Sequence, residues 1–345
     1  MAYNDDFVTY ETFGAVGDGV TDDLPAICAA HEHANSHGLP VRTRPDATYH
    51  LGYQALTAII ATDTDWNTSR FTIDDSDVYT SVDDHKRALF EVRSLLEPET
   101  FQIEHLTRYK RMVAARPAHD CHMLVENEQK RLYIRRGLKQ NNGDPQHDCF
   151  ILRQDGSIEG DIDWNYETIT RIEARPIDEK PIVLNGGVFT TLANRMEQPV
   201  GYNYWHRNIE ITRSNTTVDG LTHYVVGETA IGHPYRGFLS ANQCANITFR
   251  NCFATPHKIY STIGAAGKPV NMGSYDLHAN NVVNLHLASC RINLICDRTR
   301  WGVIATNFCK NILLEDCTFS RMDTHMGVSG EYTVRGCTFG HMGLN

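Results

Sequence analysis

The second half of the chain repeats a short motif in which alternating apolar and polar residues end in a cysteine. The four copies occupy residues 247–252, 285–290, 312–317 and 332–337. Their cysteines are 38, 27 and 20 residues apart, and such irregular spacing is typical of a solenoid whose strands stack while its loops vary in length. We therefore expect an internal ladder of free thiols made by Cys252, Cys290, Cys317 and Cys337. A metal site is the weaker alternative, because the cysteines lack paired metal-ligand spacing.

A second set of aligned segments precedes the first, at residues 237–242, 275–280 and 301–307. If Leu239 and Leu277 point inward, strand alternation places Asp276 and His278 together on one exposed sheet face. The turns that follow carry Asn246, Asn284 and Asn311. Stacked amides in turns hydrogen-bond well, so these three are expected to form an asparagine ladder along the solenoid.

Near the amino terminus, residues 13–23 form a run rich in glycine and aspartate, followed by an alanine-rich segment. Asp22 or Asp23 offers a carboxylate to the free amides of a helix start, and Pro25 suits the first turn. Gly38 stands where that helix is expected to stop. A phosphate-binding loop is the alternative, but neither its glycine spacing nor its lysine is present.

This run, the helix after it and residues 45–49 resemble the amino-terminal segment of pectin-lyase-like proteins, with Leu24 in place of Thr and Ala47 in place of Gly. The resemblance implies an all-β fold, a right-handed parallel β-helix whose end the segment caps. Together with the repeats, it predicts a β-helix with an N-terminal capping helix and an inserted α+β elaboration.

The chain is expected to be one β-helix domain over residues 1–345. Residues 1–52 form the N-terminal cap, 80–180 an insertion packed on the β-helix, and 181–345 the regular coils. Between residues 80 and 180 the coil pattern is weaker, and strands are expected around 132–137 and 148–152, with a tight hairpin at residues 154–157.

Composition restricts the partners. The formal net charge is −10 with 17 histidines, which argues against a general nucleic-acid or anionic-membrane surface. The sequence has no run of about 18 apolar residues and begins without a signal-peptide pattern. We therefore expect a soluble protein with no membrane span; its compartment is open, and it is secreted or periplasmic if a signal has been removed.

Proteins that resemble this chain act on polysaccharides along an exposed sheet face, so the expected partner is a polysaccharide or oligosaccharide. Sugar hydrolysis needs one protonated and one ionised carboxyl group. Asp276, Asp297 and Asp323 are the candidates for such a pair. The alternative is that Asp297 and Asp323 pair with neighbouring arginines or cap turns.

A second enzymatic hypothesis is a polysaccharide lyase or uronate C5-epimerase. Residues 323–325, Asp-Thr-His, resemble the Asp-Pro-His segment of β-helix alginate epimerases, with Thr324 in place of Pro. The resemblance implies His325 as the base and Arg300 or Arg321 as the group that neutralises the substrate carboxylate. No cofactor is expected, although a calcium requirement stays open; the acidic cluster of calcium-dependent pectate lyases is absent from the sequence.

Substrate-binding side chains are expected to include both charged groups and aromatic rings that stack on sugars. The candidates are His257, Lys258, Tyr275, His278, Arg300, Trp301 and Arg321. The non-enzymatic alternative is a glycan-binding, tailspike-like protein, which the resemblance implies would be a homo-oligomer, often a trimer.

Overall fold

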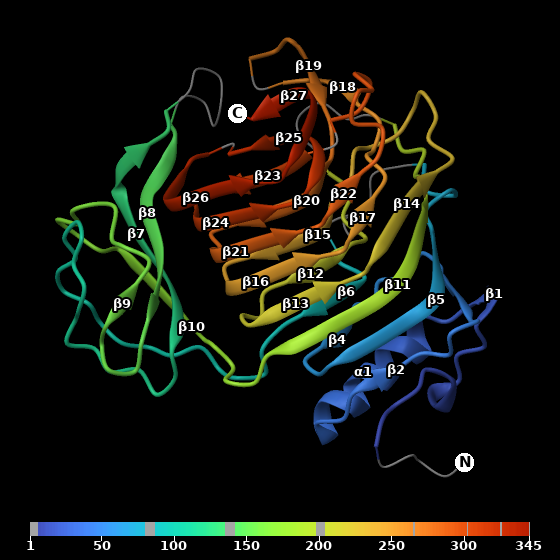
Figure 1. Cartoon of the computed structure of the whole chain (residues 1–345), viewed down its shortest axis with the longest axis horizontal. Helices are drawn as coiled ribbons and strands as arrows, with labels where there is room; N and C mark the ends of the chain where they lie inside the picture. Colours follow the sequence, from blue (N-terminus) through green and yellow to red (C-terminus); the bar gives the residue numbers. More distant parts are fainter. Residues whose placement is uncertain are drawn as a thin grey trace.

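The computed structural model describes residues 6–79, 87–134, 142–197, 204–264, 266–301, 303–324 and 326–344. Among these residues, 21 strands form one hydrogen-bonded network in which every paired strand is parallel to its neighbour and each coil stacks on the one before. Figure 1 shows the coils rising from the first strands to the carboxyl terminus. The predicted right-handed parallel β-helix is therefore confirmed.

Each full coil contributes a strand to each of three sheets, named here sheets 1, 2 and 3. Sheet 1 contains β4 (Ala58–Ile60), β6 (Phe90–Val92), β12 (Ile209–Ile211), β15 (Arg236–Asn242), β20 (Tyr275–Asn280) and β23 (Val303–Asn307), and then the ends of β25 (Thr318–Asp323) and β27 (Thr338–Leu344). Sheet 2 contains β2 (Val41–Arg42), the first halves of β5 (Thr64–Asp74) and β11 (Ile182–Leu192), and then β13 (Thr216–Asp219), β16 (Ala245–Arg250), β21 (Val283–Ala288), β24 (Cys309–Glu315) and β26 (Val328–Arg335).

Sheet 3 completes each coil. It contains β1 (Asp18–Asp22), β3 (Thr48–Leu51), the second halves of β5 and β11, β14 (Thr222–Val226), β17 (Phe253–Ala254), β22 (Arg291–Ile292) and the first residues of β25 and β27. β5 and β11 run on from sheet 2 into sheet 3, and the irregular register at Gly186 marks where they bend. A hairpin of β18 (Tyr260–Ile263) and β19 (Pro269–Met272) projects beyond sheet 3.

The interior of the solenoid is filled by side chains that stack from coil to coil. Phe71 and Phe189 stack with ring centroids 4.5 Å apart. The predicted cysteine ladder is confirmed, because all four thiols are free and line or pack against the core. At its end the backbone N–H of Cys317 donates to Sγ of Cys337 at 3.4 Å.

The predicted asparagine ladder is also confirmed. The Asn284 amide donates to Oδ1 of Asn246 at 2.9 Å, and the Asn311 amide donates to Oδ1 of Asn284 at 3.0 Å. All three residues have positive φ, between 58° and 62°. Asparagine suits this turn because it tolerates the left-handed conformation and its amide can bond to the coils above and below.

The amino-terminal motif builds a cap, as predicted. α1 (Leu24–His37), which follows a 3₁₀ turn at Glu11–Phe13, packs its buried face on the first coils (Figure 1), and Gly38 ends it with φ of 65°. Asp22 Oδ1 accepts the Leu24 N–H at 3.1 Å, while Asp23 accepts the Val16 N–H at 2.7 Å and ties down the glycine-rich loop. α1 therefore covers apolar core that the first coil would otherwise expose.

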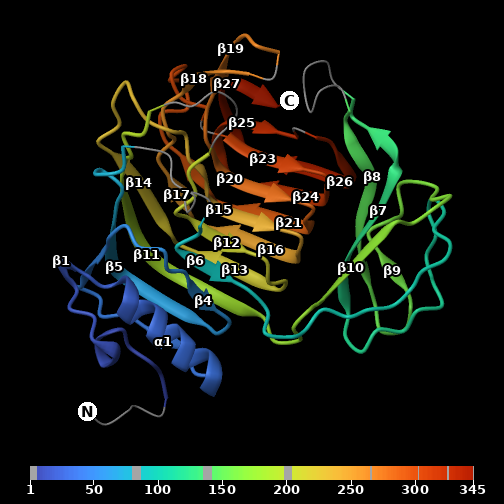
Figure 2. The ribbon, with the colours of Figure 1, turned by 180° about the vertical axis from the view of Figure 1, so that it is seen from behind.

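A separate four-stranded antiparallel sheet interrupts the coils and stands beside them (Figure 2); it is called the inserted sheet below. It consists of β7 (Cys121–Leu132), β8 (Asp144–Leu152), β9 (Ile158–Glu159) and β10 (Arg171–Pro176). Its described residues contain strands and loops but no helix, where an α+β elaboration was expected. Leu124, Cys149 and Ile151 pack it against Ala245 and Val283 of sheet 2.

No helix within the described ranges is both long enough and apolar enough to cross a membrane.

Candidate functional site

The outer face of sheet 1 carries a polar side chain on each of four successive coils. Parallel register aligns Glu91 of β6, Glu210 of β12, Ser240 of β15 and His278 of β20. The residues just before them on the last three strands are Ile209, Leu239 and Leu277, which are buried in the core. Because neighbouring side chains on a strand point to opposite faces, the polar row lies on the outside of the coil.

Hydrogen bonds connect part of this row. The Ser240 hydroxyl lies 3.3 Å from Nδ1 of His278, and the Asn307 amide nitrogen lies 3.2 Å from Nε2 of the same ring. An amide nitrogen is a donor, so Nε2 accepts and the ring proton is assigned to Nδ1, which donates to Ser240. The ring of His278 is thereby held in one orientation.

Glu210 sits in the middle of the row and is half-buried. Burial raises its pKa, and the charge of Arg236 together with hydrogen bonds from Ser240, Asn208 and Asn242 offsets only part of this rise. Within the described part of the chain, Oε2 of Glu210 is closed off from solvent and has no hydrogen-bond partner. These surroundings favour a protonated carboxyl group.

Aromatic rings lie beside the polar row. The ring centroids of Tyr275 and Trp301 are 5.3 Å apart, and those of Tyr204 and Tyr275 are 6.4 Å apart. The guanidinium of Arg321 lies over the Trp301 ring at 5.1 Å, and its NH2 bonds to Oδ2 of Asp323 at 3.1 Å. Ring faces next to paired charged groups suit the alternating C–H and hydroxyl surfaces of a sugar.

A cavity of about 430 Å³ continues from this face toward the inserted sheet. Its lining combines amide, carboxyl and ring side chains from both parts, namely Leu124, Glu126, Asp144, Pro145, His147, Gln243, Asn280, Asn281, Asn307, Phe308 and Met326. Asn307 also contacts His278. The polar row and this cavity are therefore joined through one side chain.

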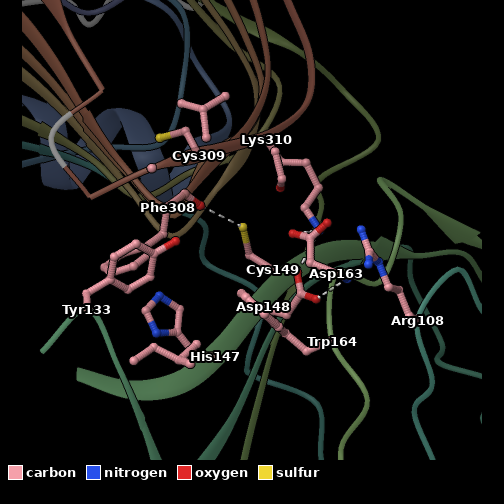
Figure 3. Close-up of a pocket in the computed structure, with 14 residues that line it drawn as sticks. Arg108, Tyr133, His147, Asp148, Cys149, Asp163, Trp164, Phe308, Cys309 and Lys310 are labelled. Atoms are coloured by element: carbon pink, nitrogen blue, oxygen red, sulfur yellow. Dashed lines mark hydrogen bonds and ion pairs between the residues drawn. The ribbon is translucent and has the colours of Figure 1, made fainter. Parts of the chain in front are cut away.

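A second cavity, of about 410 Å³ (Figure 3), is called the junction cavity below. Its walls come from the inserted sheet with its loops and from β24 and β26 with the turn before β26. The lining is Arg108, Leu132, Tyr133, His147, Asp148, Cys149, Asp163, Trp164, Phe308, Cys309, Lys310, Gly327, Val328 and Ser329. His147 and Phe308 line both cavities.

Lys310 lines the junction cavity and binds residues of the inserted sheet and its loops. Its Nζ is 2.6 Å from Oδ1 of Asp148 and 3.1 Å from Oδ2 of Asp163, and it also donates to the carbonyls of Gly160 and Asp161. The Lys310 and Asp148 side chains are each only 1% exposed. Four acceptors on one buried ammonium hold the inserted sheet to the β-helix.

The Asp148 carboxyl has a perturbed pKa. Burial raises it to about 6, the positive charge of Lys310 opposes the rise, and the charge of Asp163 adds to it. Burial alone would lower the pKa of Lys310, but Asp148 and Asp163 raise it. Lys310 therefore stays charged at neutral pH, and Asp148 takes up a proton on mild acidification.

A third group of ionisable side chains surrounds Glu228, which precedes the hairpin of β18 and β19. Its Oε1 is 3.3 Å from Nδ1 of His257 and accepts the Lys258 N–H at 2.7 Å, and its Oε2 is 2.7 Å from Arg300. Burial alone would raise the pKa of Glu228, but these partners lower it to about 2. Asp297 lies at the edge of the group, 3.5 Å from Nε of Arg300.

The structure divides the predicted site residues between two places. Tyr275, His278, Trp301, Arg321 and Asp323 meet on the outer face of sheet 1. His257, Lys258, Asp297 and Arg300 gather instead around Glu228. His325 lies outside the described residues.

Asp276 does not share an exposed face with His278. The ladder between β15 and β20 is irregular between Arg236 and Leu239, so strict alternation fails there. Asp276 is 2% exposed, and its Oδ1 accepts the backbone N–H of His257 at 3.2 Å. His278 is also buried, at 6% exposure. For Asp297, the structure shows an Asx turn in which its carboxylate accepts the Thr299 N–H at 2.8 Å.

Three important residues were missed, although the sequence contained signals for two of them. Lys310 occupies the strand position that Ala245 and Val283 fill in the two preceding coils, so a charge stands where the repeat calls for an apolar residue. Glu210 lies between Ile209 and Ile211, and this apolar–polar alternation is the sequence signal of a half-buried strand. Glu228 lies in an irregular loop and gave no comparable signal.

Among the described residues, no group of three or more His, Cys, Asp or Glu side chains is arranged to hold a metal ion.

No protein-family model and no curated protein matches the sequence. Among solved structures, the tailspike gp49 of Pseudomonas phage LKA1 is similar at 13% identity and a TM-score of 0.36, covering 90% of this chain and 64% of the tailspike chain. The surface adhesin PfbA of Streptococcus pneumoniae is similar at 10% identity and a TM-score of 0.40, covering 93% and 66%. The A-module of the mannuronan C-5 epimerase AlgE4 of Azotobacter vinelandii is similar at 10% identity and a TM-score of 0.21, covering 96% and 99%.

Likenesses this distant do not assign an activity. The stacked parallel coils, the internal ladders and the capped amino-terminal end agree with the predicted architecture. The chain has the right-handed parallel β-helix fold that its sequence indicated.

Proposed function

We propose that the outer face of sheet 1 binds a polysaccharide or oligosaccharide and that the protein hydrolyses its glycosidic bonds. The observation that carries the proposal is the aromatic pair of Tyr275 and Trp301 beside the polar row of sheet 1. Ring faces supply stacking surface for sugars, and carboxyl groups supply acid and base for glycoside cleavage.

For the reaction itself, Glu210 is the proposed acid. It is in register with Glu91 on the neighbouring coil, and neighbouring strands are about 4.8 Å apart. Carboxyl groups separated by about 5–5.5 Å are typical of retaining glycosidases. Glu210 donates its proton to the glycosidic oxygen as the C1–O bond breaks, and the Glu91 carboxylate attacks C1; water then releases the sugar.

The carboxylates favoured by the sequence fit this role less well. Asp323 is paired with Arg321, Asp297 is held in a turn beside Arg300, and Asp276 is buried beside His257. Each of the three carboxylates has its own local partner. A hydrolytic pair drawn from these three stays a prediction.

The proposal is tested by incubating the wild-type protein with a panel of glycans and analysing the products. New reducing ends without unsaturation are expected, and Glu210→Gln should lower the turnover at least a hundred-fold while leaving binding within about two-fold. Glu331→Gln, an exposed glutamate on sheet 2, is the matched control. Full turnover by Glu210→Gln would remove Glu210 from the mechanism.

A lyase or C5-epimerase is the second candidate, favoured by one observation. Arg321 lies over Trp301 on the same face, where a guanidinium can neutralise a uronate carboxylate. Arg300 is less well placed for this task, because it belongs to the group around Glu228, 2.7 Å from Oε2, and not to this face. Unsaturated uronates or inverted C5 stereochemistry among the products would establish this candidate, and binding without any product would establish a glycan-binding protein.

A further inference from the structure

The junction cavity lies between the inserted sheet and the β-helix. Figure 3 shows Tyr133, His147 and Phe308 on one side and Asp163, Lys310 and Arg108 toward the other. Its volume of about 410 Å³ is within the usual range for small-molecule sites, which often lie where two structural units meet. None of its lining residues belongs to the sequence-predicted site.

The ring side of the cavity is rigid. The Tyr133 and Phe308 rings meet edge to face with centroids 5.1 Å apart, and His147 meets Phe308 at 4.0 Å. Tyr133 is 41% exposed, so part of its surface is open to a ligand. Trp164, also in the lining, is partly buried. An apolar ring face held in this way presents a flat surface for stacking.

The charged side has limited hydrogen-bonding capacity left for a ligand. The three N–H donors of Lys310 are already shared among Asp148, Asp163 and two carbonyls. Asp163 is 28% exposed and retains acceptor capacity, while Arg108 is exposed and its guanidinium lies over Tyr109 at 4.7 Å. One carboxylate acceptor and one guanidinium donor therefore remain to face a ligand.

The charges also balance. The two carboxylates of Asp148 and Asp163 offset the ammonium of Lys310 and the guanidinium of Arg108. A site of zero net charge gives no electrostatic preference for a cation or an anion. Uncharged ligands with several hydroxyl groups match both the rings and the acceptor and donor pair.

We propose that the junction cavity binds one neutral pyranose ring, stacked on Tyr133 with its hydroxyls on Asp163 and Arg108. This inference rests on the proposed glycan-binding function, which supplies the source of the ring: an end or branch of the glycan on sheet 1. The cavity beside sheet 1 shares His147 and Phe308 with the junction cavity and contains Asn307, which contacts His278. The two cavities are therefore neighbours, and the one beside sheet 1 adjoins the polar row.

Titration calorimetry with the intact chain tests this inference. The ligands are neutral monosaccharides, acidic monosaccharides and oligosaccharides. Neutral hexoses should bind the wild type, and Tyr133→Ala and Arg108→Ala should each weaken that binding at least ten-fold. Tyr79→Ala and Arg70→Ala, at exposed positions elsewhere, are the matched controls and should bind like the wild type.

Trp301→Ala separates this inference from the proposed function. It should weaken oligosaccharide binding at least ten-fold and leave monosaccharide binding unchanged. The junction-cavity inference is overturned if no neutral monosaccharide binds the wild type, or if Tyr133→Ala and Arg108→Ala bind it unchanged. If Trp301→Ala binds oligosaccharides normally, the proposed function fails instead.

Discussion

At the residue scale, position within the coil decides what each side chain does. The asparagine ladder was predictable because register alone brings Asn246, Asn284 and Asn311 together. The environment of Asp276 was not, because a one-residue irregularity between β15 and β20 cancels simple alternation. Sequence periodicity thus predicts contacts between equivalent positions and fails where a bulge shifts the register.

The asparagine ladder predicts a specific pattern of substitution effects. The Asn284→Ala variant loses the amide hydrogen bonds to the coils on both sides. It also places alanine, which tolerates the left-handed conformation less well than asparagine, at a φ of 62°. We expect a loss of about 2–3 kcal/mol in unfolding free energy. Asn284→Gly removes the same bonds without the backbone strain, so it should be the milder change. Denaturant unfolding of both variants measures the difference, and equal destabilisation would contradict the strain component.

Buried histidines predict how stability responds to acid. Burial lowers the pKa of His31 to about 3 and of His122 to about 4, and it lowers the pKa of His223 well below its usual value. In the unfolded chain all three take up protons near pH 6.5, so the unfolded state binds more protons. Asp148 opposes this trend below pH 6, because its raised pKa lets the folded state bind a proton first, and the raised pKa values of Glu210 and Asp23 act in the same direction.

We therefore expect the free energy of unfolding to fall from pH 7 to pH 5. The slope is about 1.4 kcal/mol per pH unit for each proton that the unfolded state binds in excess of the folded state. Urea unfolding at several pH values measures it. Replacing Asp148 with Asn removes one of these opposing titrations and should steepen the fall. Stability that stays level or rises over this range would contradict the buried neutral state of the histidines.

At the element scale, the inserted sheet is docked by a few long-range contacts. Its strands carried turn and alternation signals in the sequence, which is why residues 148–152 were expected as a strand. For its attachment, the sequence showed Lys310 as a charge at an apolar repeat position but did not indicate its partner Asp148, 162 residues away. Tertiary pairing at that distance depends on how the intervening chain folds and not on local pattern.

Lys310→Met should loosen the inserted sheet selectively. The variant leaves Asp148 buried beside Asp163 without a cation, a change that typically costs about 3–5 kcal/mol. We expect faster amide hydrogen exchange in β7 and β8, while β16 and β21 exchange as in the wild type. Lys268→Met, at an exposed site in the hairpin of β18 and β19, is the control. Unchanged exchange in the inserted sheet would show that apolar packing alone docks it.

At the scale of the whole molecule, the repeats predicted the solenoid and its core ladders, and the amino-terminal motif predicted its cap. The candidate site needed the structure, because it combines the outer face of sheet 1 with side chains that the inserted sheet brings alongside. Of the predicted site residues, Tyr275, His278, Trp301, Arg321 and Asp323 came together on sheet 1. Asp276 turned away to contact His257, which lies in the group around Glu228.

The most direct test of glycan binding by sheet 1 is a crystal structure with an oligosaccharide from the panel. Sugar rings are predicted along the outer face of sheet 1, with one ring against Trp301 or Tyr275 and a hydroxyl or glycosidic oxygen within hydrogen-bond distance of Glu210. An oligosaccharide bound only to the outer faces of sheet 2 or sheet 3 would contradict the account.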